Sequence, residues 1–355
     1  MYMWSVWQPD RNVFFNSYFI RRPDGNIVVD PLAWTSEDEK QMEALGGVAH
    51  IITTNRDHER MSQLLAETFG AKVAAGERDA PLLKQQVVAS LREGDEPFSG
   101  ARVIAFDGLK SPGEIALSLP GSKAAIVGDA LWGDPAGTVR LLADDKLLDP
   151  KAAVLSLRKL WALRLEHLLV GDGACIFGGA DRVIGDYLQS RADVYVNRIN
   201  VDEINAISYP HMSEAHRAAA SAGNYEAFLQ EIGDFIGARR LGYWIATVPP
   251  GKKFCPLHSH QLEEELFFVL EGEPTIRTPR GDFACRKGDM ICFPVGDVGT
   301  HQLVNRSDKP CTVFLLGNDE REEVAYYPDS KKVLVRGRKL RVRSEPALDY
   351  YDGET

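Results

Sequence analysis

The chain has 355 residues, of which 44% are hydrophobic and 26% are charged, and its net charge is −10. This length exceeds that of one ordinary domain, so we expect two domains, and the acidic balance argues against a nucleic-acid partner. Since the chain has no apolar run of about 18 residues, no Cys-x-x-Cys pair and no signal-peptide pattern, we expect no membrane span, no disulfide framework and a cytoplasmic location.

The first half of the chain alternates short apolar runs with helical patterns, which is typical of an α/β fold. The segment Arg60–Phe69 predicts a helix that ends at Gly70, with Met61 and Leu64 on its apolar face. Asp149 followed by a proline predicts the start of a second helix, and a third is expected at 182–189. Buried strands are predicted at 17–20, 26–29, 50–53, 103–106, 115–119, 124–127 and 167–170.

The composition changes after residue 192, where we place the domain boundary, giving domains 1–192 and 193–355. Asp193–Ile199 is strand-like, and Ser213–Gly237 has a polar helical pattern. His211 and His216 lie in this polar connecting region and are expected at the surface. From Leu241 onward, short alternating strands are separated by Gly, Pro and Asp turns. This second half predicts an all-β barrel.

Two spaced motifs in the second half gather three histidines and one carboxylate. They read Gly251-x6-His258-x-His260-x4-Glu265-x6-Gly272 and Gly288-x5-Pro294-x-Gly296-x4-His301. Side chains alternate across a strand, so His258 and His260 share a face and can converge with Glu265 and His301 inside a small barrel. Such a ligand set suits one divalent transition metal: Fe, Mn, Ni, Co, Cu or Zn. Four protein ligands on a six-coordinate ion would leave positions open for water, dioxygen or substrate.

The two motifs resemble those of the cupin superfamily, over about residues 195 to 355. The resemblance implies a jelly-roll β-barrel, or double-stranded β-helix, with His258, His260, Glu265 and His301 as metal ligands. It also implies that a homodimer could form through this domain. The loops before His258 and His301 are one and two residues longer than in the tightest form of each motif. Glu263 and Glu264 do not have the ligand spacing, and we expect them in a loop or facing outward.

The segments IITTNRDHER, AAIVGDALWG and HLLVGDGACIFGG, with the β/α alternation, resemble the metallo-β-lactamase fold over residues 1–192. This resemblance implies an αββα sandwich whose loops bind two metal ions. Much of the ligand set is missing, because Thr53, Asn55 and Ser111 stand where histidines belong. Asp172 replaces the last histidine.

The remaining polar residues of that set admit two interpretations. Asp57, His58, Asp129 and Asp172 could hold a single oxygen-loving ion as a residual second site. Alternatively they are structural: Asp57 caps the following helix, and Asp129 and Asp172 stabilise Gly-Asp turns. A two-metal hydrolase is not expected, so we predict a non-catalytic N-terminal domain.

Two classes of function follow for the barrel, both with a small molecule as ligand or substrate. The first is a metal-dependent enzyme of dioxygenase, isomerase or lyase type, and the second is a metabolite sensor without turnover. A hydrolase that uses a residual single-metal N-terminal site is a third hypothesis. An acid or base beside the metal would favour an enzyme, and Tyr243, Arg277 and Glu271 are the candidates.

Overall fold

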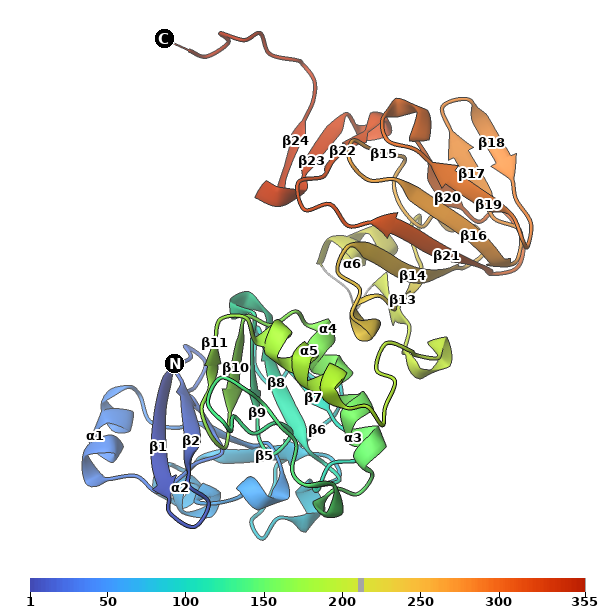
Figure 1. Ribbon diagram of the computed structural model, residues 1–355. Helices are drawn as coiled ribbons and strands as arrows, with labels where there is room; N and C mark the ends of the chain where they lie inside the picture. Colours follow the sequence, from blue (N-terminus) through green and yellow to red (C-terminus); the bar gives the residue numbers. More distant parts are fainter. Residues whose placement is uncertain (210–213, 355) are drawn as a thin grey trace. The chain divides into compact units, whose positions relative to one another are not determined.

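The computed structural model describes residues 1–209 and 214–354, so His211 lies outside the described residues. The chain divides into two compact units, Met1–Asn197 and Arg198–Thr355 (Figure 1). The sequence placed this division between residues 192 and 193. Among the helices that the structure describes, none has the length and apolarity needed to cross a membrane.

The N-terminal unit contains two sheets. The six-stranded sheet has the order β1-β2-β3-β4-β5-β6, and the five-stranded sheet has the order β11-β10-β9-β8-β7. The first comprises β1 (Tyr2–Gln8), β2 (Val13–Ile20), β3 (Ile27–Val29), β4 (His50–Thr53), β5 (Lys72–Gly76) and β6 (Ala89–Leu91). The second comprises β7 (Arg102–Ala105), β8 (Ile115–Leu119), β9 (Ala124–Val127), β10 (His167–Val170) and β11 (Ile176–Phe177).

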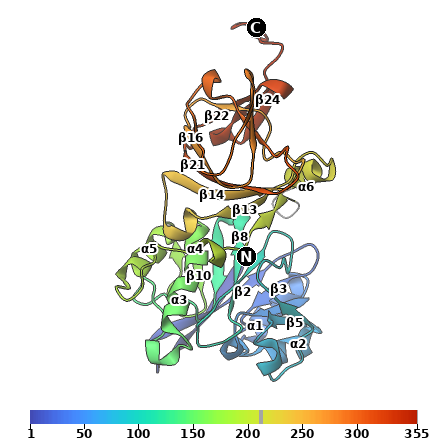
Figure 2. The ribbon, with the colours of Figure 1, turned by 90° about the vertical axis from the view of Figure 1, so that its right-hand side faces the viewer.

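Helices cover the outer faces of both sheets. On the first sheet, α1 (Ser36–Ala44) and α2 (Ser62–Phe69) share a core with Val28 and Ile51. On the second sheet lie α3 (Pro150–Ser156), α4 (Arg158–Ala162) and α5 (Ala180–Ser190). Figure 2 shows the two helix groups on opposite sides of the paired sheets. The unit is therefore an αββα sandwich, as the sequence predicted.

A separate apolar core fills the space between the two sheets. Ile27 and Ile52 of the first sheet pack there with Leu117, Ile126 and Leu169 of the second. Consecutive strands β3 to β6 are parallel, and β9 is parallel to β10. The carboxyl ends of β3 and β4 in one sheet, and of β9 and β10 in the other, carry the polar residues described below.

Several predicted elements have the bounds that the sequence indicated, including β4, β8, β9 and β10. The predicted helix at 60–69 begins at Ser62, and Gly70 ends it in the left-handed conformation. Leu64 is 47% exposed, so its assignment to the buried face was wrong. The strand expected at Asp193–Ile199 was also wrong, because this segment is irregular and Val196 packs against the helix-side core.

The C-terminal unit is rich in antiparallel strands, as the barrel pattern predicted. One sheet contains β12 (Ile207–Ser208), β13 (Phe228–Glu231), β14 (Leu241–Val248), β21 (Cys311–Asn318), β16 (Glu265–Glu271) and β19 (Met290–Phe293). A second contains β15 (Ser259–His260), β22 (Val324–Tyr327), β23 (Lys332–Val335) and β24 (Leu340–Arg343). A third contains β18 (Gly281–Ala284), β17 (Thr275–Thr278) and β20 (Gln302–Val304).

The core of this unit lies between the six-stranded and three-stranded sheets. Phe267, Phe293 and Val313 come from the first of these, and Ile276 and Leu303 come from the second. The helical pattern predicted for 213–237 was too long. The described helix, α6, spans Glu214–Ser221, and β13 follows it. His216 is partly buried in α6, and its ring contacts that of Tyr209.

The predicted cap at Asp149 gives a test of this local structure. Its side chain accepts hydrogen bonds from the amides of Lys151 and Ala152, both at 3.0 Å. We expect Asp149→Ala to lower the unfolding free energy of the N-terminal unit by about 1 kcal/mol. Urea denaturation of the full chain measures this, and the exposed Asp145→Ala is the control. Equal stability of the two variants would show that the cap contributes nothing.

Candidate metal centre

Four polar side chains of the C-terminal unit lie at the ends of different strands. His260 belongs to β15, Glu265 is the first residue of β16, and His301 directly precedes β20. His258 is joined to His301 by a pair of backbone hydrogen bonds of 3.1 and 2.9 Å. Distant parts of the sequence are thereby fixed next to one another by the strand pairing of the barrel.

The four side chains converge. The ring of His258 lies 4.7 Å from the rings of both His260 and His301, measured between centroids. The Nε2 atoms of His260 and His301 each lie 3.2 Å from Oε2 of Glu265. Ligand atoms of His258, Glu265 and His301 all lie within 4.8 Å of one another. The structure thus brings together the four residues that the sequence selected.

Three of the converging atoms have no hydrogen bond within the part of the chain that the structure describes: His260 Nε2, His301 Nε2 and Glu265 Oε2. All three are buried, and their mutual approach at 3.2 Å lacks hydrogen-bonding geometry. A buried polar atom without a partner costs roughly 1–3 kcal/mol, so such atoms are uncommon. A metal ion bound among these atoms would remove this cost.

The opposite nitrogen of each imidazole is held by an acceptor. His258 Nδ1 donates to the carbonyl of Pro256, and His301 Nδ1 donates to the carbonyl of Gly299, each at 2.9 Å. A carbonyl can only accept, so Nδ1 carries the proton of the neutral ring. The lone pair is then on Nε2, as metal ligation requires.

His260 is held by a carboxylate that sequence reasoning missed. Oε1 of the fully buried Glu323 lies 3.2 Å from His260 Nδ1. The same carboxylate accepts backbone hydrogen bonds from Gln261, Leu262 and Glu263, between 2.8 and 2.9 Å. Glu323 therefore fixes both the ring of His260 and the loop that follows it. No local spacing links it to the histidine motifs, because the contact spans 63 positions.

Glu263 lies in a loop, as predicted, but it does not face outward. It is 6% exposed, and its carboxylate forms an ion pair with Arg336. Its Oε2 also lies 3.3 Å from His260 Nδ1. Arg336 therefore supplies a positive charge beside the buried carboxylates of Glu263 and Glu323. Glu264 is exposed, as predicted.

Aromatic rings line the site. Phe293 is stacked on His301 with 3.7 Å between ring centroids, and Phe267 meets the same ring edge-on at 5.2 Å. Tyr327 is stacked on His258 at 5.9 Å. Phe267 and Phe293 exclude water from one side of the cluster, whereas Tyr327 brings an ionisable hydroxyl to the neighbourhood of His258.

The three acid/base candidates chosen from the sequence do not join this cluster. Tyr243 packs against Phe314 in a separate apolar group on the other face of β14, and Glu271 is exposed. Arg277 pairs with Asp329 at 2.6 Å, and strand alternation places it opposite the core residue Ile276. Tyr327, which the sequence did not single out, contacts His258 instead.

Burial and charge set the protonation of the cluster. Burial, with the nearby His301, lowers the pKa of His258 to about 4, so this ring is neutral near neutral pH. Burial also opposes the charge on His260, but its contacts with Glu263 and Glu265 outweigh burial and raise its pKa to about 10. Burial raises the pKa of Glu265, yet the contacts with His260 and His301 bring it well below the ordinary value.

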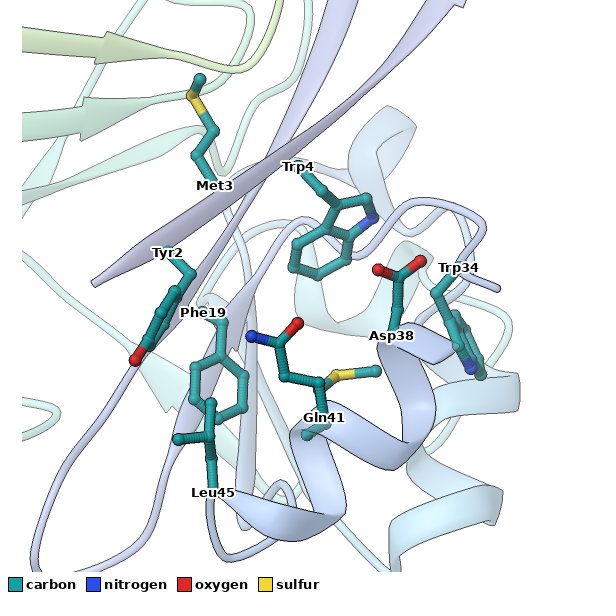
Figure 3. A pocket seen from close by; sticks show the side chains of 9 residues that line it. Tyr2, Met3, Trp4, Phe19, Trp34, Asp38, Gln41 and Leu45 are labelled. Carbon is teal, nitrogen blue, oxygen red and sulfur yellow. The ribbon is translucent and has the colours of Figure 1, made fainter. Parts of the chain in front are cut away.

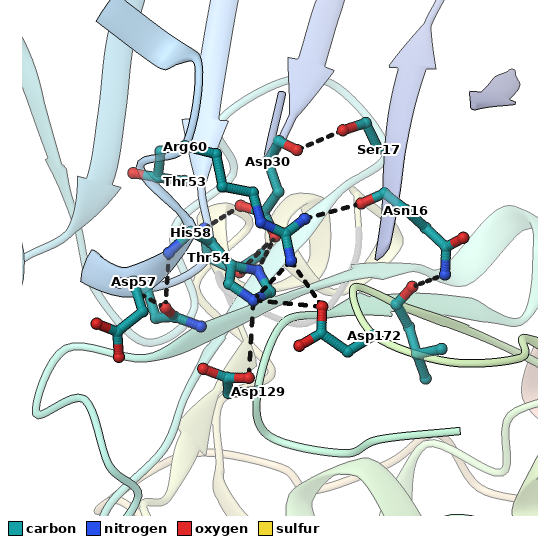
Figure 4. A network of polar contacts seen from close by, with 12 residues as sticks. Asn16, Ser17, Asp30, Thr53, Thr54, Asp57, His58, Arg60, Asp129 and Asp172 are labelled. Atoms are coloured by element: carbon teal, nitrogen blue, oxygen red, sulfur yellow. Dashed lines mark hydrogen bonds and ion pairs between the residues drawn. The ribbon is translucent and has the colours of Figure 1, made fainter. Parts of the chain in front are cut away.

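A second polar cluster lies in the N-terminal unit, where the loops after β3, β4, β9 and β10 meet (Figure 4). His58 is at its centre, with Nδ1 2.8 Å from Asp30 and Nε2 3.7 and 3.8 Å from Asp129 and Asp172. Asp30 was not singled out from the sequence. His58, Asp129 and Asp172 are all buried, and their ligand atoms lie within 4.8 Å of one another.

The two Gly-Asp turns of this cluster require glycine, because neighbouring side chains pack closely against the glycine Cα atoms. A Cβ at Gly128 would lie 2.2 Å from Thr54 Oγ1, and a Cβ at Gly171 would lie 2.6 Å from His58 Cε1. Any larger residue would push the His58 loop away from Asp129 and Asp172.

Asp57 does not join this cluster. Its carboxylate pairs with Lys110 at 2.6 Å and is 40% exposed. It does not cap α2 either, since Met61 precedes that helix without a side-chain cap. Asn55 instead accepts hydrogen bonds from the amides of Asp57 and His58.

The positions where the resemblance expects further histidines are filled by hydrogen-bonded or packed side chains. Asn55 donates to Glu114 at 3.2 Å, and burial, with the charge of Asp129, raises the pKa of Glu114 well above its ordinary value. Ser111 donates to Asp79. Thr53 is fully buried in β4. None of the three offers a nitrogen ligand of the imidazole type.

A sequence model of the metallo-beta-lactamase superfamily matches residues 1–190, which is more than half of the chain. The chain belongs to the metallo-beta-lactamase superfamily. A cupin-domain model matches residues 244–317, so this superfamily member carries a cupin domain as well. No curated protein matches the chain.

Several solved structures are similar to parts of this superfamily member. A putative sugar phosphate isomerase from Acidithiobacillus ferrooxidans is 26% identical, over 33% of this chain and 74% of that one, with a TM-score of 0.32. A sugar phosphate isomerase of the cupin superfamily from Silicibacter pomeroyi is 25% identical, over 44% and 98%, with a TM-score of 0.37. The protein TTHA1623 in a di-iron-bound form is 23% identical, over 53% and 97%, with a TM-score of 0.42.

The metallo-beta-lactamase domain also has an apolar pocket of about 140 Å³ between β1, β2 and α1 (Figure 3). Trp4, Trp34, Phe19 and Met42 contribute to its lining. Its acidic residue, Asp38, is engaged in the capping box of α1 with Thr35. The pocket therefore offers mainly shape and apolar surface, and its one carboxylate is already engaged.

The raised pKa of His260 predicts proton release when the cupin domain takes up a metal ion. His260 is protonated below about pH 10 in the metal-free protein and must be neutral to bind. Affinity should therefore fall roughly tenfold per pH unit as the pH decreases. Calorimetry with Zn²⁺ at about pH 8, in buffers of different protonation enthalpy, should give about one proton per ion. Uptake without proton release would contradict this charge assignment.

The contact between Glu323 and His260 predicts a weaker metal site when this carboxylate is changed. We expect Glu323→Gln to reduce Zn²⁺ affinity roughly 10–100-fold, because the ring and its loop lose a charged acceptor. Competition with a chelator of known affinity measures the change. The matched control is Glu322→Gln, which changes the exposed neighbouring residue in the same way. Equal Zn²⁺ affinities of the two variants would refute the role of Glu323.

Proposed function

We propose that the cupin domain binds one divalent transition metal ion through His258, His260, Glu265 and His301. A small molecule binds or reacts at that ion. Fe, Mn, Co, Ni, Cu and Zn all suit three imidazoles and one carboxylate. In this proposal the metallo-beta-lactamase domain is not catalytic.

The observation that carries the proposal is a set of buried ligand atoms with no arginine or lysine beside them among the described residues. Three clusters of potential metal ligands occur in residues 1–209 and 214–354. Arg60 occupies the one around His58, and Arg336 neutralises the one formed by His260, Glu263 and Glu323. The cluster of His258, Glu265 and His301 has no arginine or lysine in ion-pair contact among these described residues, and its inner atoms lack partners.

The ion would act as a Lewis acid, or as a redox centre if it is iron, manganese or copper. The side chains of the chain supply the rest. Glu323 orients His260, and Phe267 and Phe293 keep water from one side of the ligands. Tyr327 is stacked on His258, and burial raises the pKa of its hydroxyl, which therefore stays protonated and serves as a hydrogen-bond donor.

For the reaction at the ion we propose an enzyme of dioxygenase, isomerase or lyase type, in which Tyr327 beside His258 would donate a hydrogen bond to the substrate. The barrel scaffold hosts many chemistries, so the reaction type must be established by experiment. A metabolite sensor is the alternative, in which Tyr327 serves ligand recognition alone.

Hydrolysis by the metallo-beta-lactamase domain is the weakest of the three hypotheses. Activation of water between two metal ions needs a full set of ligands, and Thr53, Asn55 and Ser111 supply none of the imidazoles. Their buried side chains pack or bond within the protein.

Metal content of two variants tests the assignment of the site. We expect His260→Ala to lose the metal ion, because one nitrogen ligand is removed, and Asn55→Ala to retain it. Elemental analysis of untagged protein, purified without chelators, gives the ratio of metal to chain. If Asn55→Ala lost the metal and His260→Ala retained it, the ion would lie in the N-terminal unit, and the proposal would be contradicted.

Binding of azide to the Co²⁺-loaded protein tests whether the ion has a coordination position open for a substrate. Azide should change the visible spectrum of the bound Co²⁺. The variant Tyr327→Phe should bind the same amount of metal per chain as the wild type, because Tyr327 is not one of the proposed ligands. A spectrum insensitive to azide would indicate a closed structural site and contradict a role in small-molecule binding.

A further inference from the structure

The cluster around His58 contains three buried carboxylates. Asp30 is 1% exposed, Asp172 is 1% exposed and Asp129 is 7% exposed, and each lies within 4 Å of the imidazole. Buried carboxylates require a positive charge or strong donors nearby, because removing them from water is costly. Trp132 donates to Asp129 and Thr54 donates twice to Asp30, but neither residue carries a charge.

Arg60 supplies a cation at the centre of this group (Figure 4). Its Nη2 lies 2.6 Å from Asp172 Oδ1 and 3.0 Å from His58 Nε2. Its Nη1 donates to the carbonyl of Asn16 at 3.1 Å, and the guanidinium lies over the ring of Phe15 at 4.7 Å. Four neighbours thus fix the position of the guanidinium group.

The backbone of Arg60 adds a second, independent observation. Its φ of 43° lies in the left-handed region, which residues with a Cβ adopt at a cost of roughly 1–3 kcal/mol. Asp30, which bonds the other side of His58, has a φ of 51°. The chain accepts two unfavourable conformations in the residues that hold this one imidazole, so the arrangement of the arginine is built into the loop.

A metal ion in this cluster would need two atoms that Arg60 already contacts, His58 Nε2 and Asp172 Oδ1. A divalent ion bound by His58 and Asp172 would lie about 2 Å from Nε2 and from Oδ1. Arg60 Nη2 already contacts both atoms, and its positive charge would repel the ion. Asp30 holds His58 Nδ1, and the opposite ring nitrogen, Nε2, faces the guanidinium of Arg60 and not an open space.

We infer that the guanidinium of Arg60 is the resident cation of the metallo-beta-lactamase domain and excludes a divalent ion from His58, Asp129 and Asp172. Removal of Arg60 leaves one imidazole nitrogen and two carboxylates around a gap, which is a donor set for one divalent ion. The disagreement with the two-metal pattern of the superfamily is therefore a replacement of the metal by an arginine, and not only a loss of ligands.

A difference in metal stoichiometry tests this inference independently of the cupin site. After dialysis against Mn²⁺ or Zn²⁺ and removal of free metal, Arg60→Ala should contain about one equivalent more than the wild-type chain. Arg60→Ala/Asp172→Asn should return to the wild-type value. Arg78→Ala, which removes an arginine from the exposed ion pair with Asp107, should leave the value unchanged. Folded Arg60→Ala with no additional metal would overturn the inference.

The wild-type chain gives a test that does not depend on the folding of a variant. With the ring nitrogens labelled with ¹⁵N, and His58 assigned through His58→Gln, Zn²⁺ should leave the Nε2 resonance of His58 unchanged. A shift of this resonance to the position of a zinc-bound nitrogen would show that the ion displaces Arg60, and would overturn the inference. If the cupin domain binds no metal, the resonances of His258, His260 and His301 also stay unchanged on addition of Zn²⁺. The expected result for His58 is the same in either case, so the two proposals are tested separately.

Discussion

Buried carboxylates next to buried imidazoles are the constraint on which both units depend. Such a group is costly unless a positive charge lies among its atoms. Around His58 the charge is Arg60, and beside Glu263 it is Arg336. Around Glu265 no basic side chain in the described part of the chain forms an ion pair besides the histidines, and two of their nitrogens have no hydrogen-bond partner. One physical rule therefore separates a closed structural cluster from a cluster suited to a metal ion.

In both units, strand pairing brings the polar groups together, although the sheets are of different kinds. In the metallo-beta-lactamase domain, the carboxyl ends of parallel strands bring Asp129 and Asp172 to His58, and Gly128 and Gly171 allow the close approach. In the cupin domain, a backbone bridge between His258 and His301 sets the spacing of these two candidate ligands. The strands fix where the polar side chains cluster. In the proposed account, Arg60 and Arg336 neutralise two of these clusters, and a metal ion from solution binds the third.

Much of the fold, and the convergence of His258, His260, Glu265 and His301, could be predicted from the sequence, because both depend on local patterns. The buried strands at His50–Thr53 and His167–Val170 follow from short apolar runs, and the ligand motifs follow from fixed spacings. The contacts of Glu323 and Arg336 could not be predicted, because they join residues more than 60 positions apart. Arg60 is close to His58 in sequence, yet only the folded loop reveals that its side chain turns back onto the imidazole.

The most direct test of this account is anomalous scattering from crystals of the full chain grown with Zn²⁺ or Mn²⁺. The account predicts one metal peak per chain, surrounded by His258, His260, Glu265 and His301, and no peak among His58, Asp129 and Asp172. A peak beside His58, with the guanidinium of Arg60 displaced, would contradict the proposed difference between the two clusters. So would the absence of any peak in the cupin domain at metal concentrations that saturate an ordinary transition-metal site.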